Sequence, residues 1–206
     1  MRCTNYTMVM KVLASINADP ATFRNRLDVA APLVFEQDAV LAPAECDAMI
    51  ARAEQLGFSD APITTARGFV MRPDVRNNTR AMFDDVVLAA SLFDRIAPGL
   101  PPRLFDRRPV GVNERFRCYR YQPGQQFRPH YDGAFQRHDH ECSELTFMIY
   151  LNASCTGGNT AFLDFDVEVV PEIGKALFFQ HRLLHEGAVV TAGVKYVLRS
   201  DVMYAD

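Results

Sequence analysis

The feature that most constrains the fold is a series of short extended segments in the second half of the chain. From about residue 110, apolar or alternating stretches are each followed by a turn rich in Gly or Pro, such as Pro123-Gly124 and Gly157-Gly158. The expected strands are 116–121, 145–151, 157–163, 167–170, 175–179 and 194–204. Many short strands at even spacing are typical of β-sandwiches and jelly-roll barrels. The pattern therefore predicts a β-barrel core over residues 111–206.

The first half of the chain has a different pattern. Apolar residues recur at helical spacing between Pro43 and Gly57, which predicts a helix over 43–56. A second helix is expected over 81–97, because Pro98-Gly99 ends the periodic stretch. Residues 1–32 are expected to form a loose arm or a short helix. We predict an α+β fold in one domain of 206 residues, with 1–110 mainly helical support for the β core.

Composition excludes several classes of protein. The net charge of −3 and the pI of about 6.0 do not favour a nucleic-acid partner. The five cysteines are an odd number without a Cys-x-x-Cys pair, which indicates reduced thiols and a cytoplasmic protein. No apolar run approaches the ~20 residues of a membrane span, so no membrane partner is expected.

His130 and Asp132 are the first candidate site residues. They follow the Pro123-Gly124 turn and, in an extended strand, would point to the same face. An imidazole and a carboxylate side by side are two of the three ligands of the facial triad that holds non-heme Fe(II). One His-x-Asp pair is common by chance, so its meaning depends on a third ligand.

Two histidines could supply that third ligand. His185 is favoured because Gly187 and the apolar residues after it indicate the start of a strand, while His181 is the alternative and better suits a structural role. His138 and His140 lie in the polar stretch 133–144, which we expect to be an exposed loop and a possible lid over the site.

Lys195 is notable because only three of the 22 basic residues are lysine. The stretch 194–204 alternates, so Lys195, Arg199 and Asp201 share one face of a strand. A cation beside a three-ligand metal site suits the far carboxylate of a dicarboxylate co-substrate, which would also neutralise its buried charge. Arg199, on the same face, is the alternative for this role.

Taken together, His130-x-Asp132, His185, Lys195, Tyr121-Gln122-Pro123-Gly124 and Gly157-Gly158-Asn159-Thr160 resemble the iron(II)/2-oxoglutarate-dependent dioxygenases of the prolyl 4-hydroxylase-like superfamily. The resemblance covers roughly residues 113–204. It implies a double-stranded β-helix, a cupin-like jelly roll, with Fe(II) held by His130, Asp132 and His185. It also implies that Lys195 pairs with the far carboxylate of 2-oxoglutarate, that Tyr121 hydrogen-bonds it, and that O₂ is consumed.

The implied activity is hydroxylation of an aliphatic C–H, with release of succinate and CO₂. The substrate would be a small molecule, an amino acid or a peptide, and Arg76, Asn113 and Arg117 are candidates to bind it. Arg76 and Arg80 could line a pocket for an anionic or amide-bearing group, although Asn78 or Thr79 could simply cap the following helix.

Three other functions stay open. The same iron chemistry could demethylate a nucleobase or nucleic acid, but the acidic pI argues against it. A non-catalytic barrel that binds a metal or ligand would have little reason to keep the three metal ligands together with Lys195. A hydrolytic zinc site would use the same three ligands but would not explain Lys195. The sequence does not indicate an oligomeric state.

Overall fold

The computed structural model describes residues 10–15, 27–65 and 68–206. Within these ranges, ten strands form a major sheet that is built from both halves of the chain. Its main path runs β1 (Lys11–Ala14), β2 (Val34–Gln37), β15 (Ala176–Gln180), β11 (Glu141–Tyr150), β18 (Lys195–Ala205), β8 (Arg115–Tyr121), β6 (Thr79–Asp84) and β3 (Ser59–Asp60). In addition, β7 (Arg108–Val112) pairs with β18 and β10 (Gln136–His138) with β11.

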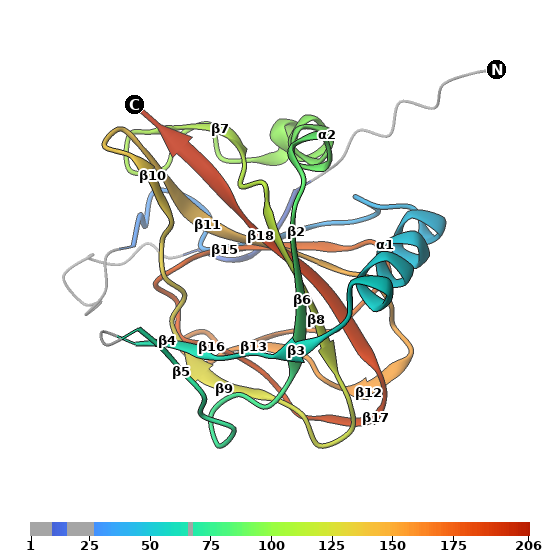
Figure 1. The fold of residues 1–206 in the computed structure, drawn as a ribbon. Coiled ribbons are helices and arrows are strands. Elements are labelled where there is room, and N and C mark those ends of the chain that lie inside the picture. The colour runs from blue at the N-terminus through green and yellow to red at the C-terminus, as the bar shows by residue number, and fades with distance from the viewer. Residues whose placement is uncertain (1–9, 16–26, 66–67) are drawn as a thin grey trace.

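A smaller sheet faces the middle of the major sheet (Figure 1). Its strands are β14 (Val167–Val169), β13 (Thr160–Phe162), β16 (His185–Gly187) and β9 (Phe127–His130), in that order. Two short strand pairs complete the β structure: β4 (Ile63–Thr65) with β5 (Gly68–Val70), and β12 (Cys155–Gly157) with β17 (Val190–Gly193). All of these pairings are antiparallel, as expected for a jelly roll.

Two helices lie outside the space between the sheets (Figure 1). Helix α1 (Pro43–Leu56) buries Cys46 and Ala53, and matches the predicted range. Helix α2 (Val86–Ile96) buries Leu92 and Ile96 and continues into the short turn η2 (Ala97–Gly99). Both helices bury these residues in a core cluster that also contains strand residues of the major sheet. Neither helix has the length and hydrophobicity to cross a bilayer.

The prediction for the second helix was wrong at its start. Residues 79–84 form strand β6, which pairs with β8 and β3, and the helix begins only at Val86. Asp85 is its N-cap, since its side chain accepts a hydrogen bond from the Leu88 backbone N–H. Thr79 and Asn78 therefore do not cap it. The first half also supplies several strands to the major sheet, so it is more than helical support.

The expectation of an irregular loop over 133–144 was also wrong. Strand β10 turns directly into β11, which begins at Glu141 rather than at residue 145. The backbone N–H of Ser143 donates to the Phe135 carbonyl, and Arg137 forms ion pairs with Glu141 and Glu114. Of the arm expected over 1–32, residues 1–9 and 16–26 lie outside the described residues, and Lys11–Ala14 form strand β1.

Three stacked rings hold β2, β15 and β11 together. Phe178 lies between Phe35 and Phe147, with ring centroids 4.9 Å and 5.1 Å away, and all three side chains are buried. Of these strands, β11 lies next to β18, which carries Lys195 and Arg199, so the stack supports one wall of the space between the sheets.

We therefore expect Phe178→Ala to lower the free energy of unfolding by about 3–5 kcal/mol, because it removes a buried ring and leaves a cavity. Equilibrium urea unfolding measures this change. Phe69→Ala is the matched control, since that ring is 74% exposed, and it should cost less than about 0.5 kcal/mol. Similar losses for the two variants would contradict the stack's role in stability.

Candidate active site

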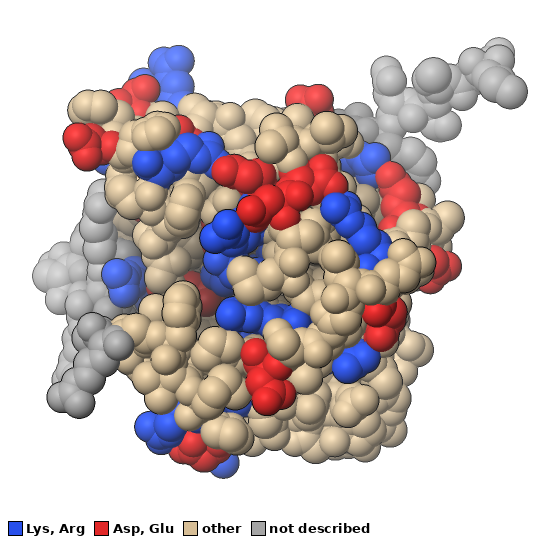
Figure 2. Space-filling model, viewed as in Figure 1, with Lys and Arg blue, Asp and Glu red and all other residues tan. Residues whose placement is uncertain are grey.

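The two sheets enclose a cavity of about 580 Å³. Strands β8, β11 and β18 line it on one side, strands β9, β13 and β16 on the other, and the β4–β5 pair reaches its mouth. Figure 2 shows a hollow at the centre of this face, with basic side chains gathered around it. The volume falls within the ~300–1,000 Å³ of small-molecule sites.

His130, Asp132 and His185 meet in this cavity. His130 ends β9 and His185 begins β16, and these two residues are direct partners in the antiparallel pairing. Asp132 follows two positions after His130, so that one ligand atom from each residue lies within 4.8 Å of the others. The Nε2 atoms of His185 and His130 lie 3.6 and 3.8 Å from the carboxylate oxygens of Asp132. This is a set of atoms that could hold a metal ion.

The two imidazoles are oriented by backbone carbonyls. His130 Nδ1 lies 2.8 Å from the Arg128 carbonyl oxygen, and His185 Nδ1 lies 3.0 Å from that of Leu183. A proton on each Nδ1 leaves each Nε2 lone pair free for a metal. Burial lowers the pKa of His130 to about 3 and also lowers that of His185, so both rings are neutral at pH 7. Phe127 stacks on the His130 ring at a centroid distance of 3.4 Å.

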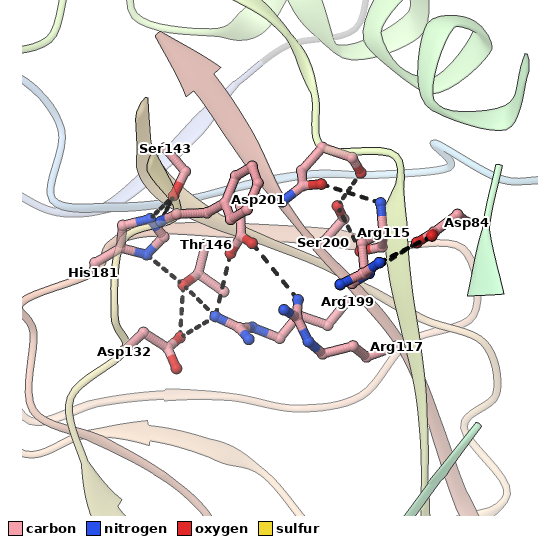
Figure 3. Close-up of polar contacts among 12 residues, drawn as sticks. Asp84, Arg115, Arg117, Asp132, Ser143, Thr146, His181, Arg199, Ser200 and Asp201 are labelled. Atoms are coloured by element: carbon pink, nitrogen blue, oxygen red, sulfur yellow. Dashed lines mark hydrogen bonds and ion pairs between the residues drawn. The ribbon is translucent and has the colours of Figure 1, made fainter. Parts of the chain in front are cut away.

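Asp132 is held by groups from the major sheet (Figure 3). Thr146 Oγ1 donates to its Oδ2 at 2.6 Å, and Arg199 Nη2 lies 3.1 Å from the same oxygen. Burial alone would raise the pKa of Asp132, but Arg199, His185 and His130 together hold it well below its usual range. The carboxylate is therefore ionised, as a metal ligand must be.

His181 supports the site without facing its centre. Its ring is buried between Ser143 Oγ, 2.8 Å from Nε2, and Thr146 Oγ1, 3.0 Å from Nδ1 (Figure 3). Its backbone carbonyl accepts the N–H of Asp132 at 3.0 Å. Both imidazole nitrogens are thus engaged away from the other two histidines. His138 and His140 are exposed, and His140 pairs with Asp206.

Lys195 is buried, lines the cavity together with Tyr121, and places its ammonium over the rings of Tyr121 and Tyr150. It is the direct partner of Tyr121 in the β18–β8 pairing, and its ammonium lies 5.3 and 5.4 Å from the two ring centroids. Nζ donates to the Gly158 carbonyl, and no carboxylate among the described residues pairs with it. Burial lowers the pKa of Lys195 to about 8. A buried cation in this state suits a bound carboxylate.

Arg199 has a different environment from Lys195. Its Nη2 lies 3.1 Å from Asp132 and 3.2 Å from Asp201, so two carboxylates already offset its charge. Burial would lower the pKa of Arg199, but Asp132 and Asp201 hold it above its usual range. The two basic residues on this strand face therefore differ sharply: one is paired within the protein, and the other is not.

The candidate substrate residues divide into two groups. Arg76 and Arg117 line the cavity. Asn113 does not, because its buried side chain accepts the backbone N–H of Arg115 at 3.1 Å. Sequence reasoning missed the role of Thr146, which depends on strand register. It also missed Tyr119, although alternation along β8 places this residue on the cavity face between Arg117 and Tyr121.

Comparisons with known proteins agree with this geometry. Residues 116–200 match the sequence model of the 2OG-Fe(II) oxygenase superfamily. No curated protein matches the chain. Among solved structures, a viral collagen prolyl hydroxylase from Paramecium Bursaria Chlorella virus-1, solved with 2OG, is 23% identical with a TM-score of 0.59, covering 84% of this chain and 97% of that chain. A Trichoplax adhaerens prolyl hydroxylase, solved with a hypoxia inducible factor peptide, is 19% identical with a TM-score of 0.65, covering 84% and 83%.

A Pseudomonas putida prolyl-4-hydroxylase is also similar, at 19% identity and a TM-score of 0.58, covering 82% of this chain and 91% of that one. These likenesses confirm the predicted double-stranded β-helix. The family match confirms the expected dependence on Fe(II), 2-oxoglutarate and O₂, which the His-Asp-His set fits. Residues 116–200 thus match the 2OG-Fe(II) oxygenase superfamily, and the chain shares its fold with prolyl hydroxylases.

Proposed function

We propose that this oxygenase hydroxylates an aliphatic C–H of a small molecule, an amino acid or a peptidyl residue. His130, Asp132 and His185 would hold Fe(II), and Lys195 with Tyr121 would bind the far carboxylate of 2-oxoglutarate. One observation carries the proposal: three ligand atoms within 4.8 Å share a cavity with a buried lysine that no carboxylate of the described residues neutralises. Once bound, Fe(II) and 2-oxoglutarate would supply the oxidising chemistry and release succinate and CO₂.

The residues around the triad prepare it for one metal geometry. Thr146 and Arg199 both engage Oδ2 of Asp132, which leaves Oδ1 free to bind the metal. The two imidazoles present Nε2 because their Nδ1 atoms face backbone carbonyls. Three protein ligands leave open positions for co-substrate and O₂, which is the arrangement of a facial triad.

The distal end of 2-oxoglutarate would lie among Lys195, Tyr121 and Thr160, all of which line the cavity. The Gly157-Gly158 turn brings the backbone close to the lysine: Gly158 has a φ of +71°, and a Cβ there would lie 3.2 Å from the Lys195 side chain. Thr160 is held by Tyr150, whose hydroxyl donates to it at 2.7 Å. These contacts fix the position of Lys195, the residue that would pair with the carboxylate, and keep it buried.

The cavity volume of about 580 Å³ supports a small substrate or a single side chain at the metal. The Trichoplax relative was solved with a peptide, which favours a peptidyl residue as the second candidate. In either case the C–H to be oxidised would lie beside the triad, on the side where Arg117 and Tyr119 line the wall.

Anaerobic addition of Fe(II) and 2-oxoglutarate to the metal-free protein tests the proposal. We expect a visible metal-to-ligand charge-transfer band in the wild type and none in His185→Ala, because one of the three ligands is lost. His138→Ala is the control, since that ring is exposed and outside the cavity, and it should keep the band. Absence of the band from the wild type would exclude the proposed metal and co-substrate site.

The affinity for 2-oxoglutarate should depend on pH through Lys195. Because burial lowers the pKa of its ammonium to about 8, the free protein loses this charge as the pH rises above 8. Binding should therefore weaken between about pH 8 and 10, with proton uptake on binding. Isothermal titration in buffers of different ionisation enthalpy measures both effects. Lys195→Met should bind 2-oxoglutarate weakly at every pH, without the loss of affinity above pH 8. If this variant kept the wild-type pH dependence, a group other than Lys195 would cause it.

Thr146→Val should weaken metal binding by about 10–100-fold, because the isosteric side chain cannot hydrogen-bond to Asp132 or His181. Competition with a metal-sensitive dye measures the change. Thr191→Val is the matched control, since its hydroxyl bonds only the Thr156 carbonyl away from the cavity. Equal affinities in the two variants would show that Thr146 does not position the carboxylate.

A further inference from the structure

Arginine side chains cover much of the cavity wall away from Lys195. Alternation along β8, β18 and β6 places Arg117, Arg199 and Arg80 on the cavity face, and Arg76 joins them from the segment before β6. The strand register makes the crowding explicit: Arg117 is the direct partner of Arg199, and Arg80 is the direct partner of Tyr119. Like charges directly opposite each other destabilise a sheet, so these cations need negative partners.

Two carboxylates compensate only part of this charge. Asp201 lies between Arg199 and Arg117, but its Oδ2 is 3.7 Å from Arg117, beyond hydrogen-bond distance (Figure 3). Arg117 Nη1 is buried and makes no hydrogen bond among the described residues. Asp132 pairs with Arg199 and is itself committed to the triad. Arg117 is therefore only weakly neutralised.

Arg76 and Arg80 have no carboxylate partner among the described residues. Arg76 is only 5% exposed; its Nε donates to Asn78, while its buried Nη2 finds no hydrogen-bond partner in the described part of the chain. Its guanidinium lies over the Tyr119 and Phe127 rings, 4.5 and 4.4 Å from their centroids, which fixes its position. Arg80 lines the cavity, and burial together with Arg76 and Arg117 lowers its pKa, although Tyr119 opposes this. Both guanidinium groups would gain from an anion.

The pKa of the Tyr119 phenol reflects the positive charge of these arginines. Full burial would raise its pKa, yet Arg76, Arg199 and Arg117 lower it to about 8. An uncompensated positive cluster costs folding free energy, and a bound anion offsets this cost.

This cluster is separate from the place assigned to 2-oxoglutarate. Lys195 and Arg199 are four positions apart on β18, which corresponds to about 13 Å along the strand. Tyr119 and Val197 lie between the two ends of the cavity wall. The charge of the surrounding surface also restricts the ligand. Acidic side chains lie beside the hollow in Figure 2 and would repel a long polyanion.

We propose that Arg76, Arg80 and Arg117 form an anion-binding subsite that holds a carboxylate or phosphate group of a small-molecule substrate. The inference rests on the proposed function and narrows its substrate class to small anions. The subsite would fix one end of the substrate by charge and place a C–H of its other end beside the triad. The two basic groups of the cavity would then bind different ligands: Lys195 the co-substrate and the three arginines the substrate.

The test is isothermal titration of the full chain, kept anaerobic and saturated with Fe(II) and 2-oxoglutarate, with acetate, inorganic phosphate and neutral acetamide. We expect saturable binding of acetate or phosphate but not acetamide, and the tighter anion identifies the group. Arg80→Gln and Arg117→Gln should each weaken binding by about tenfold or more, because each removes a charged hydrogen-bond donor. Thermal unfolding of both variants verifies that they are folded.

Arg115→Gln is the matched control. It removes the same charge from the same strand, and Arg115 also lines the cavity, but both arms of this guanidinium already pair with Asp84, at 2.9 and 3.0 Å. Anion affinity should stay within about twofold of the wild type, since a paired surface charge contributes little. An equal loss in Arg115→Gln would reduce the effect to general electrostatics and overturn the subsite, as would the absence of saturable anion binding.

The co-substrate provides the second comparison. Arg80→Gln should keep the wild-type affinity for 2-oxoglutarate, whereas Lys195→Met should lose it. If Arg80→Gln instead lost 2-oxoglutarate, the cluster would serve the co-substrate and the subsite would be refuted. If the wild type bound no 2-oxoglutarate, the proposed function would fail, and the same anion titration on the metal-free chain would still decide the subsite by itself.

Discussion

The buried ion pair between Arg199 and Asp132 joins the two sheets at the point where the triad lies. Arg199 belongs to β18 of the major sheet, and Asp132 follows β9 of the smaller one. Such a pair is stable only where further hydrogen bonds satisfy both charges. Here Thr146 and Asp201 satisfy most of this requirement from the major sheet, while Arg199 Nε makes no hydrogen bond within the described residues. The contact ties the carboxylate of the triad to the strand that also carries Lys195.

Much of the fold follows from local sequence patterns. Alternation predicted β8 and β18 almost to the residue, and Pro43 with Gly57 bounded helix α1 correctly. The prediction failed at β6, whose six residues have enough apolar character to continue the helical pattern after them. Strand pairing with β8 and β3 decided the outcome, and such long-range contacts leave no periodic signal.

The candidate site was predictable where several residue types that suit one chemistry recur along the chain. His130, Asp132, His185 and Lys195 were candidates from the sequence, and the structure brings all four into one cavity. Thr146 could not be predicted, because its contact with Asp132 exists only when β11 and the end of β9 are brought together. The difference between Lys195 and Arg199 was equally hidden: both are cations on one strand face, and only the positions of Asp132 and Asp201 separate them.

The stack of Arg76, Phe127 and His130 along β9 places the proposed anion subsite next to the triad. The Arg76 guanidinium lies on one side of the cavity against Phe127, and Phe127 stacks directly on the His130 ring. An anion bound at Arg76 and a metal bound at the triad would therefore lie on opposite sides of one ring, Phe127. If binding of the anion changes the affinity for the metal, the reverse change has the same size. Binding of an anion at the arginines and binding of a metal at the triad would then be linked equilibria.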